Sequence, residues 1–507
     1  MAFLGMYRQA RTAHVQSITG ETFVSLGTHA MSGKNVFTEG GVIALAEGKL
    51  RNHMQLCRAL KIPYNTGMSH VVLKAYQTWG ADYPRHMEGA VMTAVIDRAE
   101  DRMIVARDRI GAIDVYYAWR SRSCAFASEE KLLLLAGVAG RRVGREGMLE
   151  MLLLNKTPTP GRTPFQDIRI LEPGTVLIAD ARGARIKRYY SLIRAVKSCV
   201  KHDENAYKER YSEAIKDMLP LHPGAIWSGD SLQSEMILRL AEKSNGEMRV
   251  YWDKEYNCKL EKEKLRSLGV SMEGMETAIP SLIDILENTV ETIGFPGSGF
   301  KEAYLFSALS KMKETERAIA VMPEKSVLSE DAYKIDTDKA LMYLNSDAAH
   351  TLCADSFLAD RRREMLDRLI FSSDSGEYDE KSERKAVWAL SFLPAYSGRI
   401  TSLCQRHSLA ALSPLWDERV TEAFLAFGCA KSTCASSSEI QMPRECLRQL
   451  FSEALRISGD EKEPIYDFID GKKIQKHVRG GCADINALLK LIQINLFFRL
   501  FEAEASI

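Results

Sequence analysis

The spacing of apolar residues changes near residue 200, and this change constrains the fold more than any other feature of the chain. Before it, short apolar runs alternate with polar residues around polar turns, as in 90–108, 115–129 and 175–190. A period of two residues indicates antiparallel hairpins. Helical spacing is seen in "SHVVLKAYQTWG" (69–80) and "GREGMLEMLLLN" (144–155). The strand and helix patterns in residues 1–195 therefore predict an α+β domain of stacked layers.

Beyond about residue 203, long helical periods dominate. Two short apolar runs, "GAIW" (224–227) and "MRVYWD" (248–253), flank a segment in which Leu232, Met236 and Leu240 repeat at helical spacing. This β-α-β order predicts two parallel strands joined by a helix. After residue 294 nearly every segment has a helical period, so 203–507 predict an α/β domain with a parallel sheet and many helices.

Charge, cysteines and hydropathy exclude several classes of protein. Lys plus Arg number 68 against 67 Asp plus Glu, so no basic surface for nucleic acid is indicated. The start lacks a secretory signal, and the 10 cysteines form no Cys-x-x-Cys pair. The apolar segment 485–501 is shorter than the ~20 residues of a membrane span and is interrupted by Lys490, Gln493, Asn495 and Arg499. These features predict a cytoplasmic protein with no membrane or nucleic-acid partner, and a packed helix at 485–501.

The loop that follows the run at 224–227 is the first candidate site. It contains Ser228, Gly229, Asp230 and Ser231, directly before the predicted helix. Backbone amides and the helix dipole at a helix N-terminus attract anions, and a glycine lets a phosphate approach. Asp230 and Ser231 are also ordinary N-cap residues, which satisfy the same amides. The loop is thus either a phosphate site or a capped helix start.

Several motifs follow one another in a known order. They are "RDRIG" (107–111), "FASEEK" (126–131), an "F-x-x-I-x-x-L-x-PG" pattern (165–174), "RY" (188–189) and "SGRITSLCQRHSLAALSPLWDERVTEAFLAF" (397–427). In order and spacing the chain resembles asparagine synthetase B, a family that joins a glutaminase domain to an ATP-using synthetase domain. The resemblance implies an Ntn-type, glutaminase-like αββα sandwich of the class II amidotransferases over 1–195. It implies a PP-loop ATPase-like domain over 203–507.

The residues that the family uses to hydrolyse glutamine have no counterpart here. The family's nucleophile is a cysteine directly after the initiator methionine, where this chain has Ala2. Its Asn-Gly-Glu segment aligns with Gly40–Val42, and its Ser-Asp-Thr-Glu segment aligns with Gly67–His70, where Met68 replaces the aspartate. Nucleophile, amide donor and substrate anchor are all replaced, so we expect no glutaminase activity.

The ATP loop of the family, "SGGLDSS", matches this chain in two ways. Without gaps, Asp230–Gln233 stand where Gly, Leu, Asp and Ser are expected, and the magnesium ligand is lost. With a two-residue deletion, Ser228–Ser231 keep the pattern "SG..DS", and Asp230 becomes the magnesium ligand. The resemblance therefore implies Ser228, Gly229, Asp230 and Ser231 as ATP-binding residues in a degenerate or modified loop.

Two further segments of the family's synthetase site have weak matches. The family's "LSGEGADE" corresponds to 318–334, where both glycines are missing and "SED" (329–331) equally suits a helix cap. The segment "DEKEPIYDF" (460–468) places Lys462 where the family has a catalytic lysine beside the adenylate. The other interpretation of Lys462 is a solvated lysine in a charged run.

These observations favour a pseudoenzyme, a noncatalytic binding or scaffolding member of the family with a protein partner or a second copy of itself. The alternative is an ATP-dependent carbon–nitrogen ligase, as in β-lactam synthetases and lasso-peptide cyclases. Such a ligase would activate a small-molecule or peptide carboxylate with ATP and magnesium and release AMP and pyrophosphate. Asparagine synthesis from free ammonia would require the same ATP site.

Overall fold

The computed structural model describes most of the chain. The described residues are 2–7, 23–26, 29–33, 35–120, 123–154, 157–198, 204–226, 231–245, 247–253, 262–275, 279–297, 299–312, 316–322, 337–370, 380–426 and 442–506. Within these ranges no helix has the length and apolar character needed to cross a bilayer. The chain divides into two compact units. The first is Met1–Gly147, Thr159–Ala195 and Ala389–Gly398, and the second is Met148–Pro158, Val196–Trp388 and Arg399–Ile507.

The first unit contains two antiparallel sheets, each of six strands in the part of the chain that the structure describes. The first sheet has the order β11 (Ile168–Ile170), β8 (Tyr116–Arg120), β9 (Ser123–Ala127), β1 (Leu4–Tyr7), β3 (His29–Ser32), β2 (Phe23–Leu26). The second has the order β13 (Gly183–Arg188), β12 (Thr175–Asp180), β7 (Arg102–Ala106), β6 (Val91–Asp97), β5 (Val42–Gly48), β4 (Val36–Glu39). The three predicted hairpins are confirmed as the antiparallel pairs β6–β7, β8–β9 and β12–β13.

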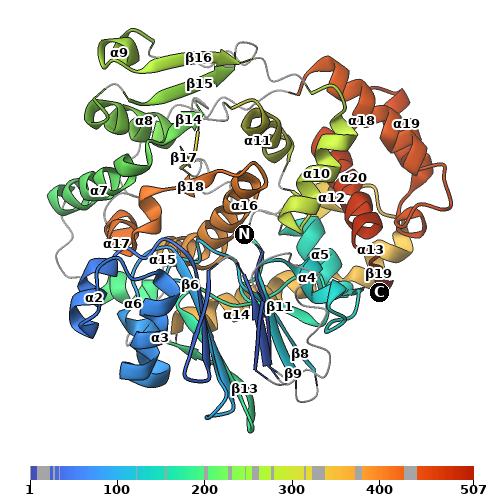
Figure 1. Ribbon diagram of the computed structural model, residues 1–507. Helices are drawn as coiled ribbons and strands as arrows, with labels where there is room; N and C mark the ends of the chain where they lie inside the picture. Colours follow the sequence, from blue (N-terminus) through green and yellow to red (C-terminus); the bar gives the residue numbers. More distant parts are fainter. Residues whose placement is uncertain are drawn as a thin grey trace. The chain divides into compact units, whose positions relative to one another are not determined.

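The core of this unit lies between its two sheets. Phe3 and Phe126 of the first sheet and Ile43 and Leu45 of the second belong to one buried cluster. Alternate residues of the second sheet, such as Ala44, face a second cluster built with α2 (His53–Leu60) and α3 (Met68–Trp79). The helix α4 (Glu130–Leu135) contacts β8 and β9 without entering the core between the sheets. Figure 1 shows α2 and α3 on the side of β6, in the second sheet.

The "RDRIG" motif shapes the loop that follows β7. The carboxylate of Asp108 accepts hydrogen bonds from the backbone amides of Ile110, Gly111, Ala112 and Ile113, at 2.7–3.1 Å. The buried guanidinium of Arg107 donates to the carbonyls of Leu171 (2.7 Å), Ile113 (2.9 Å) and Gly111 (3.0 Å), and it pairs with Asp114. The motif therefore organises a buried turn whose backbone groups would otherwise be unsatisfied.

Glu130, in the "FASEEK" motif, is buried at the start of α4. Burial, and next the charge of Asp114, raise the pKa of the Glu130 carboxyl well above its usual value. A folded-state pKa above the unfolded value means that the folded chain holds the proton more tightly. Stability from this group is thus complete at low pH and is lost as the pH rises above about 4.3.

We expect Glu130→Gln to remove this pH dependence, because a neutral amide carries no charge to desolvate. At pH 7–8 the variant should unfold at higher urea concentration than the wild type, by on the order of 1 kcal/mol. Urea unfolding between pH 5 and 8 measures the effect, with Glu129→Gln as the control because Glu129 is exposed. Identical pH profiles for Glu130→Gln and the wild type would contradict the prediction.

The second unit is built on a parallel sheet of five described strands. Its order is β16 (Ser271–Met275), β15 (Arg249–Asp253), β14 (Gly224–Ile226), β17 (Ala318–Ala320), β18 (Ala410–Leu412). The predicted parallel pairing of the runs at 224 and 248 is confirmed, with Ala225 opposite Val250. The helix α8 (Ser231–Lys243) connects these two strands. From β14 the chain first adds β15 and β16 on one side of the sheet. It then adds β17 and β18 on the other side.

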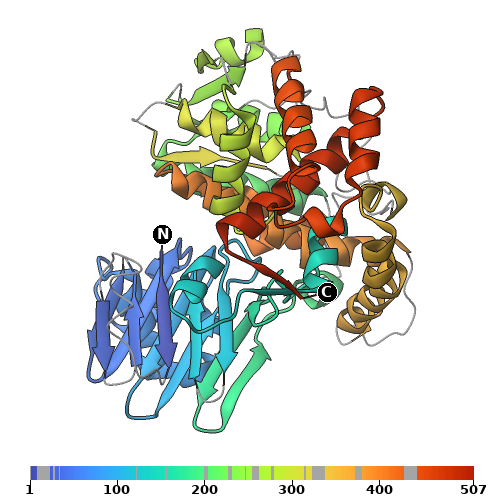
Figure 2. The same ribbon diagram turned by 90° about the vertical axis from the view of Figure 1, so that its right-hand side faces the viewer.

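Helices make up most of the rest of the second unit. The C-terminal segment forms α20 (Ile485–Leu500), in which most side chains are buried, and it contacts α10 (Leu282–Ile293) and α18 (Arg444–Ile457). Figure 2 shows α18 and α20, together with α19 (Gly471–Arg479), in orange and red. The other described α-helices of at least seven residues in this unit are α7 (Glu204–Met218), α11 (Phe300–Ser310), α13 (Ser346–Leu352), α14 (Ala354–Ile370), α15 (Glu380–Val387) and α17 (Glu418–Ala426). Three more helices, α5 (Arg145–Leu153), α6 (Leu192–Ser198) and α16 (Leu393–Arg406), contain residues of both units.

Candidate functional sites

The first candidate site is the carboxyl edge of the parallel sheet between β14 and β17. The order in which strands are added to the sheet reverses between β14 and β17. From β14 the chain continues to β15 and β16 on one side, whereas β17 is followed by β18 on the other side. Open α/β sheets bind ligands outside the carboxyl ends of their strands at such a switch point. The chain leaves β14 at Ile226 and begins α8 at Ser231, so the loop predicted to bind ATP starts at this point.

Of the four residues predicted to bind ATP, Ser228, Gly229 and Asp230 lie outside the described residues. Ser231 is the first residue of α8, and its side chain is also outside the described set. The roles of these residues in binding ATP and magnesium stay a prediction. Within the segment matched to "LSGEGADE", the structure describes β17 and the two residues that follow it, Val321 and Met322.

One side chain that sequence reasoning did not single out occupies the switch point. Gln233, on the first turn of α8, is 6% exposed. Its side-chain nitrogen donates to the carbonyl of Ile226 at the end of β14 (3.2 Å) and to that of Ala320 at the end of β17 (3.3 Å). Its side-chain oxygen accepts from the amide of Met322 (2.8 Å). The amide of Gln233 thus joins the ends of the two strands between which a ligand would enter.

Lys462 lies in the turn between α18 and the short helix η8 (Tyr466–Phe468). Its side chain is exposed, and its backbone amide donates to the carboxylate of Asp460 (3.0 Å). The next residue, Glu463, binds Arg456 and the side-chain amide of Asn495. These contacts suit a turn on the surface, and the catalytic role of Lys462 stays a prediction.

The second candidate site belongs to the first unit, where the family's glutamine pocket was expected. Gly40 and Gly41, aligned with the Asn-Gly-Glu segment, form the tight turn between β4 and β5 with φ values of +59° and +83°. Two successive positive φ angles are typical of a type I′ hairpin turn, which explains the two glycines. Gly40 is exposed. The pair is thus accounted for by the hairpin alone.

At the opposite end of β5, a group of polar residues is linked by hydrogen bonds. Glu47 is 1% exposed and lies on the face of β5 that carries Ile43 and Leu45 into the core between the sheets. Its carboxylate accepts from the side-chain amide of Asn35 (3.3 Å). Ser69, at the start of α3, donates to the backbone carbonyl of Asn35 and accepts from the amide of Ala46 (3.0 Å). Sequence reasoning missed this group. The one sequence feature that indicates it is a glutamate at the end of the apolar run "VIALAE" (42–47).

The neighbours of this polar group are apolar or aromatic. Met68, which stands where the family has its substrate-binding aspartate, packs against the core under α3. His70 stacks on Phe37 with ring centroids 4.3 Å apart and an interplanar angle of 16°. Gly33, which follows β3, lies against Leu45 and Phe3, so this end of β5 is near the start of β1. In the described part of this group, the carboxylate of Glu47, the side-chain amide of Asn35 and the hydroxyl of Ser69 therefore already take part in hydrogen bonds within the protein.

Two cysteines of this unit are in the core. Cys57, on α2, belongs to the cluster under α3, and burial raises the pKa of its thiol. Cys124, on β9, faces the core between the sheets, and burial raises the pKa of its thiol to about 12. The thiolate is the nucleophilic form of cysteine, so at neutral pH neither residue is suited to attack a substrate.

Comparison with known proteins finds similar sequences for part of the chain. Residues 26–190 match the family model of a glutamine amidotransferase domain. Over 127 residues the chain is 32% identical to asparagine synthetase [glutamine-hydrolyzing] 3 of Bacillus subtilis, covering 25% of this chain and 21% of the relative. Over 152 residues it is 24% identical to putative asparagine synthetase [glutamine-hydrolyzing] 2 of Methanocaldococcus jannaschii, covering 29% of each protein. In these segments the chain is similar to glutamine amidotransferase domains and to asparagine synthetases.

The extent of these matches is limited. The chain spans 21% and 29% of the lengths of the two relatives. Among solved structures, a glutamine phosphoribosylpyrophosphate amidotransferase from Bacillus subtilis, complexed with ADP and GMP, aligns with a TM-score of 0.27 and 11% identity. That alignment covers 62% of this chain and 94% of the other. The likeness to asparagine synthetases thus rests on the sequence matches.

Proposed function

We propose that this asparagine synthetase-like protein is noncatalytic and acts by binding a partner. The observation that carries the proposal is the position of Gln233 at the switch point of the parallel sheet. The amide of Gln233 already binds two strand-end carbonyls and one backbone amide there. A nucleotide that used these backbone groups would have to displace a buried side chain and break its three hydrogen bonds.

The first unit supports the same proposal. Ala2 stands where the resemblance places a nucleophilic cysteine, and Met68 stands where it places an aspartate. The described polar group at the end of β5 contains the buried carboxylate of Glu47. This carboxyl group accepts a hydrogen bond from Asn35, whereas catalysis requires donors aimed at the oxyanion that forms when an amide is attacked. Glutamine hydrolysis is therefore disfavoured by the described polar group as well as by the missing thiol.

The proposed partner is a protein, either a different chain or a second copy of this one, and the proposed location is the cytoplasm. A pull-down from the native cell should return a stable complex. Size-exclusion chromatography with light scattering would separate the two forms of the proposal by the mass of the complex. If both the pull-down and the chromatography returned only the monomer, binding of a protein partner would be contradicted as the function.

A second candidate function is supported by the placement of the loop before α8. The loop runs from the central strand of the parallel sheet into the N-terminus of a 13-residue helix, where backbone amides attract phosphate. In this alternative, Ser228–Ser231 would hold ATP, Asp230 would bind magnesium, and Lys462 would act beside the adenylate. The product would be an amide formed from a small-molecule or peptide carboxylate, with release of AMP and pyrophosphate.

Thermal unfolding with and without magnesium ATP distinguishes the two candidates. For the noncatalytic protein we expect the same melting temperature with millimolar magnesium ATP as with magnesium alone. An ATP-binding protein with ligand at ~100 times its dissociation constant would be stabilised by about 2.7 kcal/mol, which raises the melting temperature by several degrees. A glutamine-hydrolysing asparagine synthetase is the positive control. A magnesium-dependent shift of several degrees in this chain would contradict the noncatalytic proposal.

A further inference from the structure

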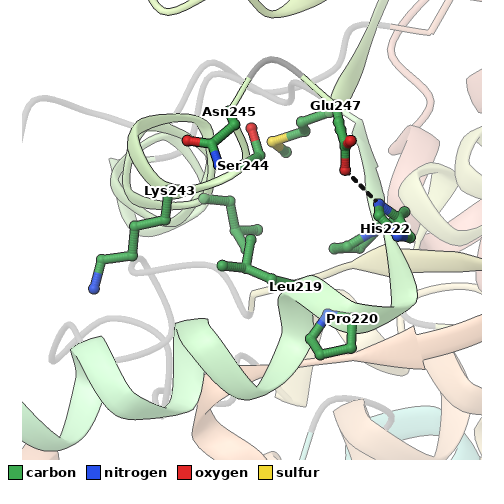
Figure 3. Close-up of a pocket in the computed structure, with 10 residues that line it drawn as sticks. Leu219, Pro220, His222, Lys243, Ser244, Asn245 and Glu247 are labelled. Atoms are coloured by element: carbon green, nitrogen blue, oxygen red, sulfur yellow. Dashed lines mark ion pairs between the residues drawn. The ribbon is translucent and has the colours of Figure 1, made fainter.

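A pocket lies at the amino edge of the parallel sheet, the edge opposite to Gln233. Its volume is ≈ 320 Å³. One wall is formed by the short helix η2 (Leu219–Leu221) and the residues that lead from it into β14. The other is formed by the end of α8 and the residues that lead into β15. Figure 3 shows the lining side chains, which all belong to the second unit.

The floor of this pocket is apolar. Leu240 and Met248 line it and are 0% and 2% exposed, and Leu219 and Pro220 complete it from the side of η2. The turns at the rim are held by backbone hydrogen bonds, from the amide of His222 to the carbonyl of Leu219 (2.9 Å) and from that of Glu247 to Ser244 (3.0 Å). The pocket is therefore formed without a ligand, and a bound molecule would not have to order its walls.

Three ionisable side chains line the pocket, the carboxylate of Glu247 and the basic groups of His222 and Lys243. The carboxylate of Glu247 lies 3.1 Å from Nδ1 of His222, and both side chains are about two-thirds exposed, at 66% and 65%. Lys243 donates to the hydroxyl and carbonyl of Ser212, and Figure 3 shows its amine directed away from the Glu247 side of the pocket. The C-terminal end of α8 adds the partial negative charge of its last carbonyls.

We propose that this pocket binds an organic cation, a primary amine attached to an apolar body. The apolar body would cover Leu219, Leu240 and Met248, and the ammonium group would pair with Glu247. A volume of ≈ 320 Å³ suits a small molecule. The site is separate from both candidate sites described above, and it does not depend on whether the protein binds ATP.

The test uses n-hexylamine as the probe and the full-length protein, with ligand-observed NMR titration as the measurement. We expect a dissociation constant of about 1 mM for hexylamine, because apolar contact and one exposed ion pair give modest affinity. Hexanol has the same apolar body without the charge and should bind about two- to fivefold more weakly. Hexanoate places a negative charge beside Glu247 and should not compete with hexylamine.

Two variants test the geometry. Glu247→Gln removes the charge and should weaken hexylamine binding about two- to fivefold while leaving hexanol unchanged. Glu242→Gln, on the exposed side of α8 and outside the pocket lining, is the matched control and should bind as the wild type does. Leu219→Trp fills the pocket and should abolish binding of both probes.

Thermal unfolding of each variant establishes that it is folded. The proposal is overturned if hexanoate binds as tightly as hexylamine, or if Glu247→Gln binds hexylamine with wild-type affinity. It is also overturned if hexylamine gives no saturable binding up to about 20 mM, where a 1 mM site would be nearly full.

Discussion

Replacement of Arg107 by methionine should lower the free energy of unfolding of the first unit by about 3–5 kcal/mol. Arg107 is 2% exposed, and its guanidinium donates to the carbonyls of Leu171, Ile113 and Gly111 and pairs with Asp114. Methionine fills much of the same space but donates no hydrogen bond. Three backbone carbonyls and one carboxylate would lose this partner in the interior, where desolvation is costly.

Urea unfolding of the wild type and of Arg107→Met measures this loss of stability, in the unfolding transition of the first unit. Arg109→Met is the matched control, because Arg109 belongs to the same motif but is only partly buried. It donates to the carbonyl of Arg85 (3.0 Å) and lies over the ring of Tyr190, so we expect a loss of about 1 kcal/mol. Equal losses for the two variants would show that the network around Arg107 does not dominate the stability of this loop.

The second large effect is expected for Gln233→Leu, which should destabilise the second unit by about 3 kcal/mol. Leucine has nearly the same volume but cannot donate to Ile226 and Ala320 or accept from the amide of Met322. The ends of β14 and β17 would then lose the side chain that joins them. Because the crevice stays filled by an apolar group, no gain in nucleotide binding is expected.

Thermal and urea unfolding measure this loss, with Glu235→Gln on the exposed face of α8 as the control. The control should unfold as the wild type does. A Gln233→Leu variant of unchanged stability would show that water or a neighbouring group replaces the lost hydrogen bonds. In that case the amide of Gln233 would be dispensable at the switch point, and the main support for a noncatalytic protein would be lost.

Sequence reasoning succeeded where the signal is local. The period of two residues in 90–108 predicted the β6–β7 hairpin, and the β-α-β order around 224–253 predicted the parallel pair β14–β15. These patterns are readable because side chains alternate across a strand every two residues and return to one helix face every 3.6 residues. The resemblance to asparagine synthetases, inferred from motifs such as "RDRIG" and "FASEEK", is supported by sequence matches to two of those proteins.

The candidate sites depended on contacts that no local pattern contains. In the sequence, Glu47 is only a polar residue at the end of an apolar strand. The structure shows that it belongs to a polar group with Asn35 and Ser69. Gly40 and Gly41 were matched to a substrate-binding segment, yet their positive φ angles are explained by a hairpin turn. A short alignment compares residue types, whereas the role of a residue depends on the elements that fold against it.

By itself, the sequence determined the likeness to asparagine synthetases, the two kinds of secondary structure and the direction of the central strand pair, because each follows from residue identity and short-range spacing. Tertiary structure alone decided what fills the switch point of the parallel sheet. Gln233 lies seven residues from Ile226 but 87 and 89 residues from Ala320 and Met322. Only the parallel sheet brings these backbone groups to one place, and only there does the side chain of Gln233 satisfy all three of them.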